Sequence, residues 1–412
     1  MQAIVKNRQY FKFCFYGFLK NLRFFDAFFI LFLLEKGLSY TEIGILYASR
    51  EIFINILEIP SGIIADTYGR KNSLIASFIA YIASFYIFYS STEFWFFLLA
   101  FLLYGVGDAF RSGTHKGMIM DYLKLNNWSS KKIQYYGYTR SCSQKGSAIS
   151  SLMAGIFVFY VGSYDNIFLF SIVPYLLNLI LIISYPQELN YSSESDNISK
   201  RGRAKDVFIS FFQTVKQPNI LRIINTSATH SAYLQAIKDY IQPLMVNIAL
   251  VIPILLYMDT EKKNGLIVGI IYFFIYLANS QASRLSSRFV KLKKGEISFV
   301  TLIIGFSLGI ITGVFYYFDL WFLSILSFIG IFIVENIRKP ILTGFVSDNV
   351  SNDILTSVIS AQSQLKTIIT AILAFSFGLL ADKYGIGISL FAISSILLLF
   401  SLVSNVINSK ND

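Results

Sequence analysis

Residues 62–91 read GIIADTYGRKNSLIASFIAYIASFYIFYSS. The last twenty, residues 72–91, contain no Asp, Glu, Lys, Arg or His, and a helix of about 20 apolar residues crosses the hydrocarbon core of a bilayer. In the turn before them, Gly69 permits a tight reversal, and Arg70 and Lys71 supply the positive charge typical of cytoplasmic loops. The stretch therefore predicts a membrane-crossing helix that begins on the cytoplasmic side.

The whole chain has the composition of a membrane protein. Of its 412 residues, 55% are hydrophobic and 14% are charged, against about a quarter charged in soluble domains, and the mean hydropathy is +0.58. Apolar stretches long enough to span a bilayer number about twelve, near residues 11–36, 40–66, 72–91, 94–123, 133–161, 166–185, 219–248, 264–290, 297–317, 320–346, 355–382 and 386–406. Barrel strands would be about ten residues long with alternating polarity, so these segments favour helices. We therefore expect an all-α, polytopic membrane protein.

The net charge of +11 lies mainly in the short loops between these spans and does not indicate nucleic-acid binding. Placing the N-terminus in the cytoplasm puts most loop lysines and arginines on the cytoplasmic side, as the positive-inside bias requires. The opposite loops hold only Lys36, Lys262 and Lys263, with Lys383 at a helix end. Both termini are therefore expected in the cytoplasm.

A polar, serine-rich segment, residues 186–218, divides the spans into two sets of about six. It becomes amphipathic at Val207–Val215, which predicts a short surface helix within a cytoplasmic linker. We expect two six-helix bundles, residues 1–185 and 219–412, with weak sequence similarity between them. Halved bundles of this kind are a common plan of secondary transporters, with the solute bound between the halves.

The loop after the second span resembles the signature G-x-x-x-D-x-x-G-R-[KR] of the major facilitator superfamily, in the position where that family carries it. The resemblance implies twelve helices in two pseudo-symmetric bundles, and a charge network at this loop that latches the two halves in one state. The latch residues implied here are Gly62, Asp66, Gly69, Arg70 and Lys71, with Asp121 at the inner end of the fourth span as the acidic partner. A similar stretch, Gly378–Gly385, falls on the outer side and is interpreted as a helix-end turn.

Every third span is free of charge, whereas the spans between carry ionisable side chains. The charge-free stretches are 72–91, 166–185, 297–317 and 386–406. An ion at the bilayer centre costs about 3 kcal/mol or more, so ions within spans are expected to face a polar interior. The candidates for solute binding or coupling are Arg23, Asp26, Glu51, Asp108, Arg111, His115, Arg140, Lys145, His230, Glu335, Arg338 and Lys366. For each residue alone, a structural ion pair is an equally good interpretation.

Asp108, Arg111 and His115 are the strongest candidates, because spacings of three and four residues place them on one helical face. Across all spans the buried cations outnumber the buried acids. A low-dielectric cavity lined with surplus cations attracts anions. The carboxylates within the spans, together with His115, are candidates for binding a coupling proton.

These patterns predict a secondary transporter that works by alternating access, is coupled to protons and carries an anion or an acidic amphiphile. The alternative is a proton-driven exporter of lipophilic drugs, although the fifth span lacks the G-P-x-x-G-G element typical of drug antiporters. An enzyme or lipid scramblase would need a catalytic cluster near one interface, and a sensor would need an output domain; the sequence suggests neither. We expect no cofactor, metal site or phosphate-binding loop. The expected setting is a monomer in a bacterial cytoplasmic membrane, whose partners are the solute, protons and lipid.

Overall fold

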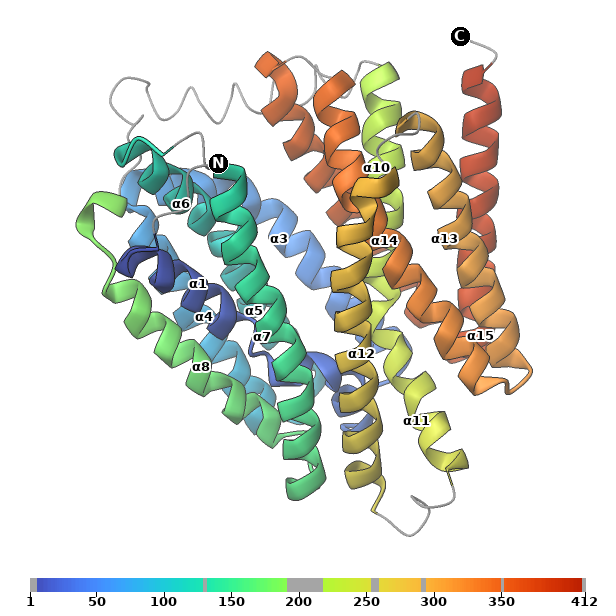
Figure 1. The fold of residues 1–412 in the computed structure, drawn as a ribbon. Helices are drawn as coiled ribbons and strands as arrows, with labels where there is room; N and C mark the ends of the chain where they lie inside the picture. Colours follow the sequence, from blue (N-terminus) through green and yellow to red (C-terminus); the bar gives the residue numbers. More distant parts are fainter. Residues whose placement is uncertain are drawn as a thin grey trace.

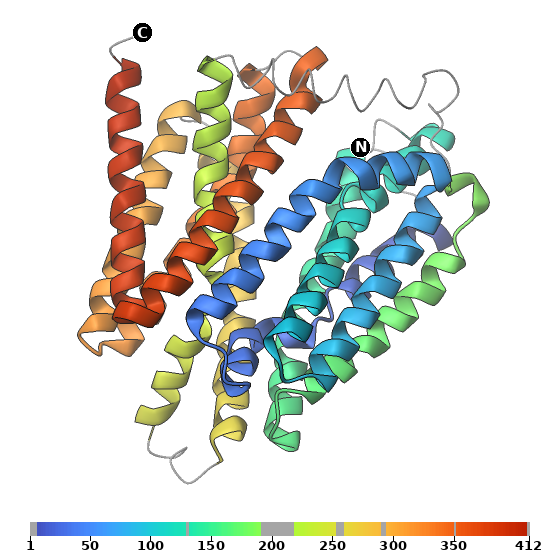
Figure 2. The same ribbon diagram turned by 180° about the vertical axis from the view of Figure 1, so that it is seen from behind.

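The computed structural model of the chain consists of helices throughout the residues that it describes. Those residues are 6–128, 132–190, 218–252, 259–289, 294–349 and 352–409. Figures 1 and 2 show the helices running between an end that holds both termini and an opposite end, which holds the connections 36–39 and 162–165 and which we call the far end. Helices satisfy their own backbone hydrogen bonds, as hydrocarbon surroundings require.

The first six predicted spans are all helical. The first consists of α1 (Arg8–Lys20), the 3-10 turn η1 (Phe24–Ala27) and α2 (Phe29–Glu35). The second and third are α3 (Tyr40–Tyr68) and α4 (Arg70–Ser90), and the fourth combines α5 (Phe94–Arg111) with α6 (Thr114–Leu125). The fifth and sixth are α7 (Lys132–Val161) and α8 (Asn166–Ile183), followed by the short η3 (Gln187–Leu189).

The remaining six spans are helical as well. The seventh consists of α10 (Pro218–Ile237), η4 (Lys238–Tyr240) and α11 (Ile241–Val251), and then come α12 (Thr260–Phe289), α13 (Lys294–Tyr317) and α14 (Trp321–Asn349). The last two spans are the arms of α15 (Asn352–Ser409), which reverses direction at Gly385, where φ is +82°. Within the described residues, seven stretches can cross a membrane on length and composition alone. The predicted all-α membrane fold is thus confirmed.

Three spans, the first, fourth and seventh, are interrupted near their middles. The interruptions lie between α1 and α2, at Ser112–Gly113, and at η4. Gly113 has a φ of +76°, a left-handed value that glycine adopts without steric cost. Broken helices expose backbone and polar side chains inside a bundle, and in transporters such breaks surround the bound solute.

At the far end, helices from the two parts of the chain touch backbone to backbone. A Cβ atom built on Gly44 of α3 would lie 2.7 Å from the carbonyl oxygen of Ala374 in α15. One built on Gly155 of α7 would lie 2.7 Å from the carbonyl oxygen of Gly265 in α12. Real side chains do not approach this closely, so glycine is what lets these membrane helices meet.

A carboxylate of α15 extends this contact to the start of α3. Asp382 accepts hydrogen bonds from the backbone amides of Tyr40 (2.8 Å) and Thr41 (2.7 Å). A negative charge at a helix N-terminus is favourable, because the first amides lack partners within the helix. Asp382 therefore ties the second half of the chain to the first at the far end.

The contact between α3 and α15 stops before the end that holds the termini. Asn55 donates to the Thr367 hydroxyl (2.5 Å), and Gln364 donates to Glu58 (2.9 Å). Beyond them, a Cβ atom on Gly62 would meet nothing within 4 Å outside its own helix. Figure 1 shows the two groups of helices leaning apart toward this end. The two halves are thus joined at the far end and separate at the other.

The predicted linker, residues 186–218, falls largely outside the described residues, and so does the surface helix expected at Val207–Val215. Its first residues follow α8 and return to the loop between α3 and α4. There the Asn190 carbonyl accepts a hydrogen bond from the Arg70 amide at 2.7 Å.

Candidate functional site

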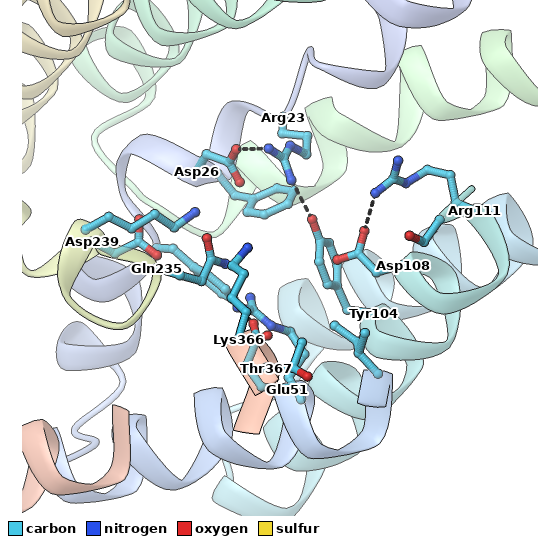
Figure 3. Close-up of a pocket in the computed structure, with 16 residues that line it drawn as sticks. Arg23, Asp26, Glu51, Tyr104, Asp108, Arg111, Gln235, Asp239, Lys366 and Thr367 are labelled. Atoms are coloured by element: carbon cyan, nitrogen blue, oxygen red, sulfur yellow. Dashed lines mark hydrogen bonds and ion pairs between the residues drawn. The ribbon is translucent and has the colours of Figure 1, made fainter. Parts of the chain in front are cut away.

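A cavity of about 200 Å³, the central cavity, lies where the breaks in the first, fourth and seventh spans meet α3 and α15. Five cations and four carboxylates line it: Arg23, Asp26, Arg50, Glu51, Asp108, Arg111, Lys238, Asp239 and Lys366. All but Arg50, Lys238 and Asp239 belong to the predicted site residues. Figure 3 shows the labelled side chains converging from both halves of the chain.

On the side of the first six spans, each cation of the central cavity is paired with a carboxylate. The pairs are Arg23–Asp26 (2.8 Å), Arg50–Glu51 (2.8 Å) and Arg111–Asp108 (2.9 Å). Phenol groups complete them: Tyr104 accepts from Arg23 at 2.8 Å, and Tyr81 donates to Asp108 at 2.6 Å (Figure 3 shows the first of these). Buried ions are tolerated when they are paired and hydrogen-bonded in this way.

On the side of the last six spans, the cations are not paired. The side-chain ammonium groups of Lys238 in η4 and Lys366 in α15 make no hydrogen bond or ion pair with any residue that the structure describes. The carboxylate beside them, Asp239, accepts from the Tyr47 hydroxyl of α3 at 2.9 Å. One wall of the central cavity therefore presents two ammonium groups that no described carboxylate contacts directly.

The predicted set of Asp108, Arg111 and His115 is divided by the break at Ser112–Gly113. The helix does not continue through the break, so the four-residue spacing no longer places Arg111 and His115 on one helical face. Asp108 lines the central cavity and His115 lines a second cavity, whereas Arg111 lines both. The His115 ring stacks on Tyr16 with ring centroids 3.6 Å apart. The expected single stripe is wrong for this physical reason.

His230, Glu335 and Arg338 form a separate buried cluster among α10, α13 and α14. The His230 Nδ1 atom lies 2.7 Å from the Glu335 carboxylate, which also accepts from Ser231. Arg338 donates to the Thr301 hydroxyl at 2.9 Å. The three side chains are 0%, 3% and 1% exposed and line neither cavity.

Two further predicted residues lie on α7. Lys145 is exposed and lines neither cavity, and the side chain of Arg140 lies outside the described residues. Among the described residues, no three His, Cys, Asp or Glu side chains gather closely enough to hold a metal ion.

The loop between α3 and α4 is bound to its own half of the chain. Arg70 forms an ion pair with Asp121 of α6. The Lys71 ammonium donates to the Tyr185 carbonyl at 3.0 Å, and Gly69 turns the chain with a φ of +98°. The side chain of Asp66 lies outside the described residues. The contacts of the loop thus join α4, α6 and the segment after α8.

The central cavity includes residues that the sequence set omits. Lys238 and Asp239 are visible in the sequence as adjacent charges within an apolar span. In the structure Asp239 accepts a hydrogen bond from Tyr47 of α3. Both side chains reach the central cavity from the 3-10 turn η4, and no glycine or proline marks this turn in the sequence.

The sequence matches the Major Facilitator Superfamily over residues 18–372. It is 23% identical over 393 residues to the uncharacterized MFS-type transporter YxaM of Bacillus subtilis (strain 168), covering 94% of this chain and 92% of that protein. The structure is similar to that of the nucleoside transporter NupG, with a TM-score of 0.73, 13% identity, and 96% and 99% of the two chains covered. It is also similar to a POT family transporter in complex with 5-aminolevulinic acid, with a TM-score of 0.76, 13% identity, and 98% and 96% covered.

Proposed function

We propose a substrate class and a coupling ion for this chain, which belongs to the major facilitator superfamily and is a secondary transporter, not an enzyme. The solute is a small organic or inorganic anion, or an amphiphile with an acidic group, and it binds in the central cavity. The bundles at 1–185 and 219–412, joined by the linker at 186–218, rock about it in alternating access. The structural neighbours named above are too distant in sequence to indicate which solute.

The two unpaired lysines support this proposal more than any other observation. Lys238 and Lys366 are only half-buried, and in a low-dielectric cavity an ammonium group without a bonded carboxylate attracts an anion. Lys238 and Lys366 lie on the second half, whereas each cation that the first half contributes to the central cavity is already paired with a carboxylate. A bound anion bonded to both lysines would therefore complete the charge pairing of the central cavity.

Sidedness is the second part of the proposal. We place the end that holds the termini in the cytoplasm of a bacterial cell, because loops at that end carry most of the loop cations. The far-end contacts of Gly44, Gly155 and Asp382 then close the outer side, and the conformation faces inward. We further propose that the protein acts as a monomer in the cytoplasmic membrane.

Proton coupling is the third part. Asp26, Glu51 and Asp108 are held by cations that a solute anion could displace, which would leave a carboxylate free to take a proton. The buried pair of His230 and Glu335 is a second candidate, because binding one proton would change the net charge of the pair. Both groups support the proposed coupling to protons.

The latch at the loop between α3 and α4 is proposed to act in the opposite conformation. Arg70 and Asp121 hold the loop in shape, and a Cβ atom on Gly62 would meet no described atom of another helix within 4 Å. In the outward-facing state, this surface would receive the inner end of α15, with Asp66 at the junction.

A proton-driven drug exporter remains the rival function, because Phe25, Phe29 and Tyr104 also line the central cavity. Aromatic rings bind lipophilic compounds, but nine charged side chains share the same lining. A lipophilic drug without an acidic group would leave Lys238 and Lys366 unpaired. We therefore favour the acidic solute.

A ligand screen tests the proposed substrate class. Purified protein is screened by thermal shift against matched acidic, neutral and basic small molecules, since a ligand that binds only the native state raises the melting temperature. We expect acids to stabilise the wild type and to lose about ten-fold or more in affinity in Lys366→Gln and Lys238→Gln, because each loses a charge-assisted hydrogen bond. Lys145→Gln, which removes an exposed cation outside both cavities, is the control. Stabilisation by neutral or basic compounds alone would refute the proposal.

A further inference from the structure

A second cavity, of about 210 Å³, lies within the first half of the chain. It is bounded by α1, by the break between α5 and α6, and by α7. It shares only Arg111 and Ser112 with the central cavity. We call it the inner cavity. Neither Lys238 nor Lys366 lines it, so its chemistry is independent of the substrate proposal.

The charged lining of the inner cavity is entirely basic. Lys20, Arg111 and Lys116 line it together with His115, and no carboxylate does. The central cavity, by contrast, holds four carboxylates against five cations. When all the charged groups that line a low-dielectric cavity are positive, the cavity attracts and concentrates anions.

Two polar side chains of α1 lack partners in the inner cavity. The Lys20 ammonium makes no hydrogen bond or ion pair with any described residue. The nearby carboxylates Asp26 and Asp108 are already bonded to arginines. The Tyr16 hydroxyl is likewise buried without a partner among the described residues, and Tyr16 is only 3% exposed.

The start of α6 adds favourable potential at the same place. Gly113, which lines the inner cavity, is the N-cap of this twelve-residue helix, and no side chain caps it. The first amides of a helix attract anions through the helix dipole. The hydroxyls of Thr139 and Ser143 on α7 complete a polar lining.

We infer that the inner cavity is a second anion site, which binds one oxyanion group of phosphate type between Lys20, Tyr16 and Arg111. The unpartnered ammonium and phenol groups donate to the oxyanion, and Arg111 faces it from the rim shared with the central cavity. The oxyanion is either a free phosphate from solution or the phosphate of an anionic lipid headgroup. Both present the same acceptor atoms to these donors.

Binding of inorganic phosphate tests this inference. Equilibrium dialysis with labelled phosphate is performed on the purified full chain at constant ionic strength in chloride. We expect Lys20→Gln to weaken phosphate binding about ten-fold or more, and Tyr16→Phe, which removes one hydroxyl, about three-fold. Lys20→Arg keeps the charge and is expected to retain binding. Lys145→Gln, on the exposed side of α7, is expected to change nothing.

Two measurements separate a binding site from a structural role. If Lys20 served stability, Lys20→Gln would lower the melting temperature without phosphate. We expect it to leave that temperature unchanged or raise it, because an unpaired, half-buried cation is removed. The Lys238→Gln/Lys366→Gln double variant is expected to keep the Lys20-dependent phosphate binding. A failed substrate proposal would therefore leave this result intact.

Native mass spectrometry with phosphatidylglycerol and phosphatidylcholine distinguishes the two sources of the oxyanion. Binding of phosphatidylglycerol that depends on Lys20 supports the inference and assigns the site to lipid. Binding of inorganic phosphate that depends on Lys20 supports it and assigns the site to a soluble anion. The inference is overturned if neither ligand binds in a Lys20-dependent way, or if Lys20→Arg binds as poorly as Lys20→Gln.

Discussion

Removing the Asp382 carboxylate should open the far end of the protein. Asp382 accepts two amide hydrogen bonds from the start of α3, on the opposite half of the chain. The helix α3 keeps its own capping box, in which Ser39 and Glu42 bond to each other's amides, so Asp382→Ala leaves the helix capped. The variant thus removes a contact between the two halves and leaves the cap of α3 in place.

The size of the effect follows from the geometry. A hydrogen bond to a charged group contributes about 1.5–3 kcal/mol when it is well shielded. Because Asp382 is exposed and screened by water, we reduce the total for both bonds to about 1–2 kcal/mol. That energy corresponds to about a 5- to 30-fold change in the ratio of far-end-closed to far-end-open molecules.

The ratio can be measured as a distance distribution by pulsed electron spin resonance in lipid nanodiscs. Spin labels are placed at the exposed positions Tyr160 and Phe322, one on each half at the far end, after Cys14 and Cys142 are replaced. Asp382→Ala is expected to add a population with a longer distance.

The matched control is Asp259→Asn, which removes a far-end carboxylate whose partner, Lys262, lies on its own helix. Its distance distribution should equal that of the wild type. If Asp382→Ala gives the same distribution as this control, Asp382 does not hold the two halves together at the far end.

Three further variants test other parts of the structure. Gly155→Leu would place a side chain against the backbone of Gly265. We expect the same spin labels to report an open far end in this variant. An unchanged distance would show that α7 and α12 are not in contact there. Glu335→Leu leaves His230 and its surroundings without their carboxylate and should destabilise the protein by about 3–5 kcal/mol, measured as thermal unfolding in detergent. Gly69→Ala forces a side chain into a left-handed turn and should cost about 1–2 kcal/mol by the same measurement, with no loss expected if the turn is flexible.

The helical spans were predictable because the length of an apolar stretch depends only on consecutive residues of the sequence. The charge-free stretch 72–91 and the helix α4 (Arg70–Ser90) agree to within about two residues, the usual uncertainty of a helix end. The ion pair of Arg70 with Asp121 was likewise expected from the loop signature. Such features depend on residues that are close together in the sequence or on a motif known from the family.

The interior of the site was less predictable, because three helices break there. Spacing rules assume a continuous helix, and the break at Ser112–Gly113 therefore separated His115 from Asp108. The contacts of Lys238 and Asp239 depend on α3 and α15, which are far away in sequence. Sequence reasoning found the charges but could not determine which of them are paired.

The most direct measurement is solute flux into proteoliposomes. Uptake of a labelled acid chosen by the ligand screen is compared between the wild type, the Lys238→Gln/Lys366→Gln double variant and Lys145→Gln. We predict that the double variant loses about 100-fold or more of the uptake at low solute concentration, at about ten-fold per lost hydrogen bond, while Lys145→Gln retains it. Transport of neutral or cationic solutes only, at rates that the double variant does not change, would contradict the anion-binding central cavity.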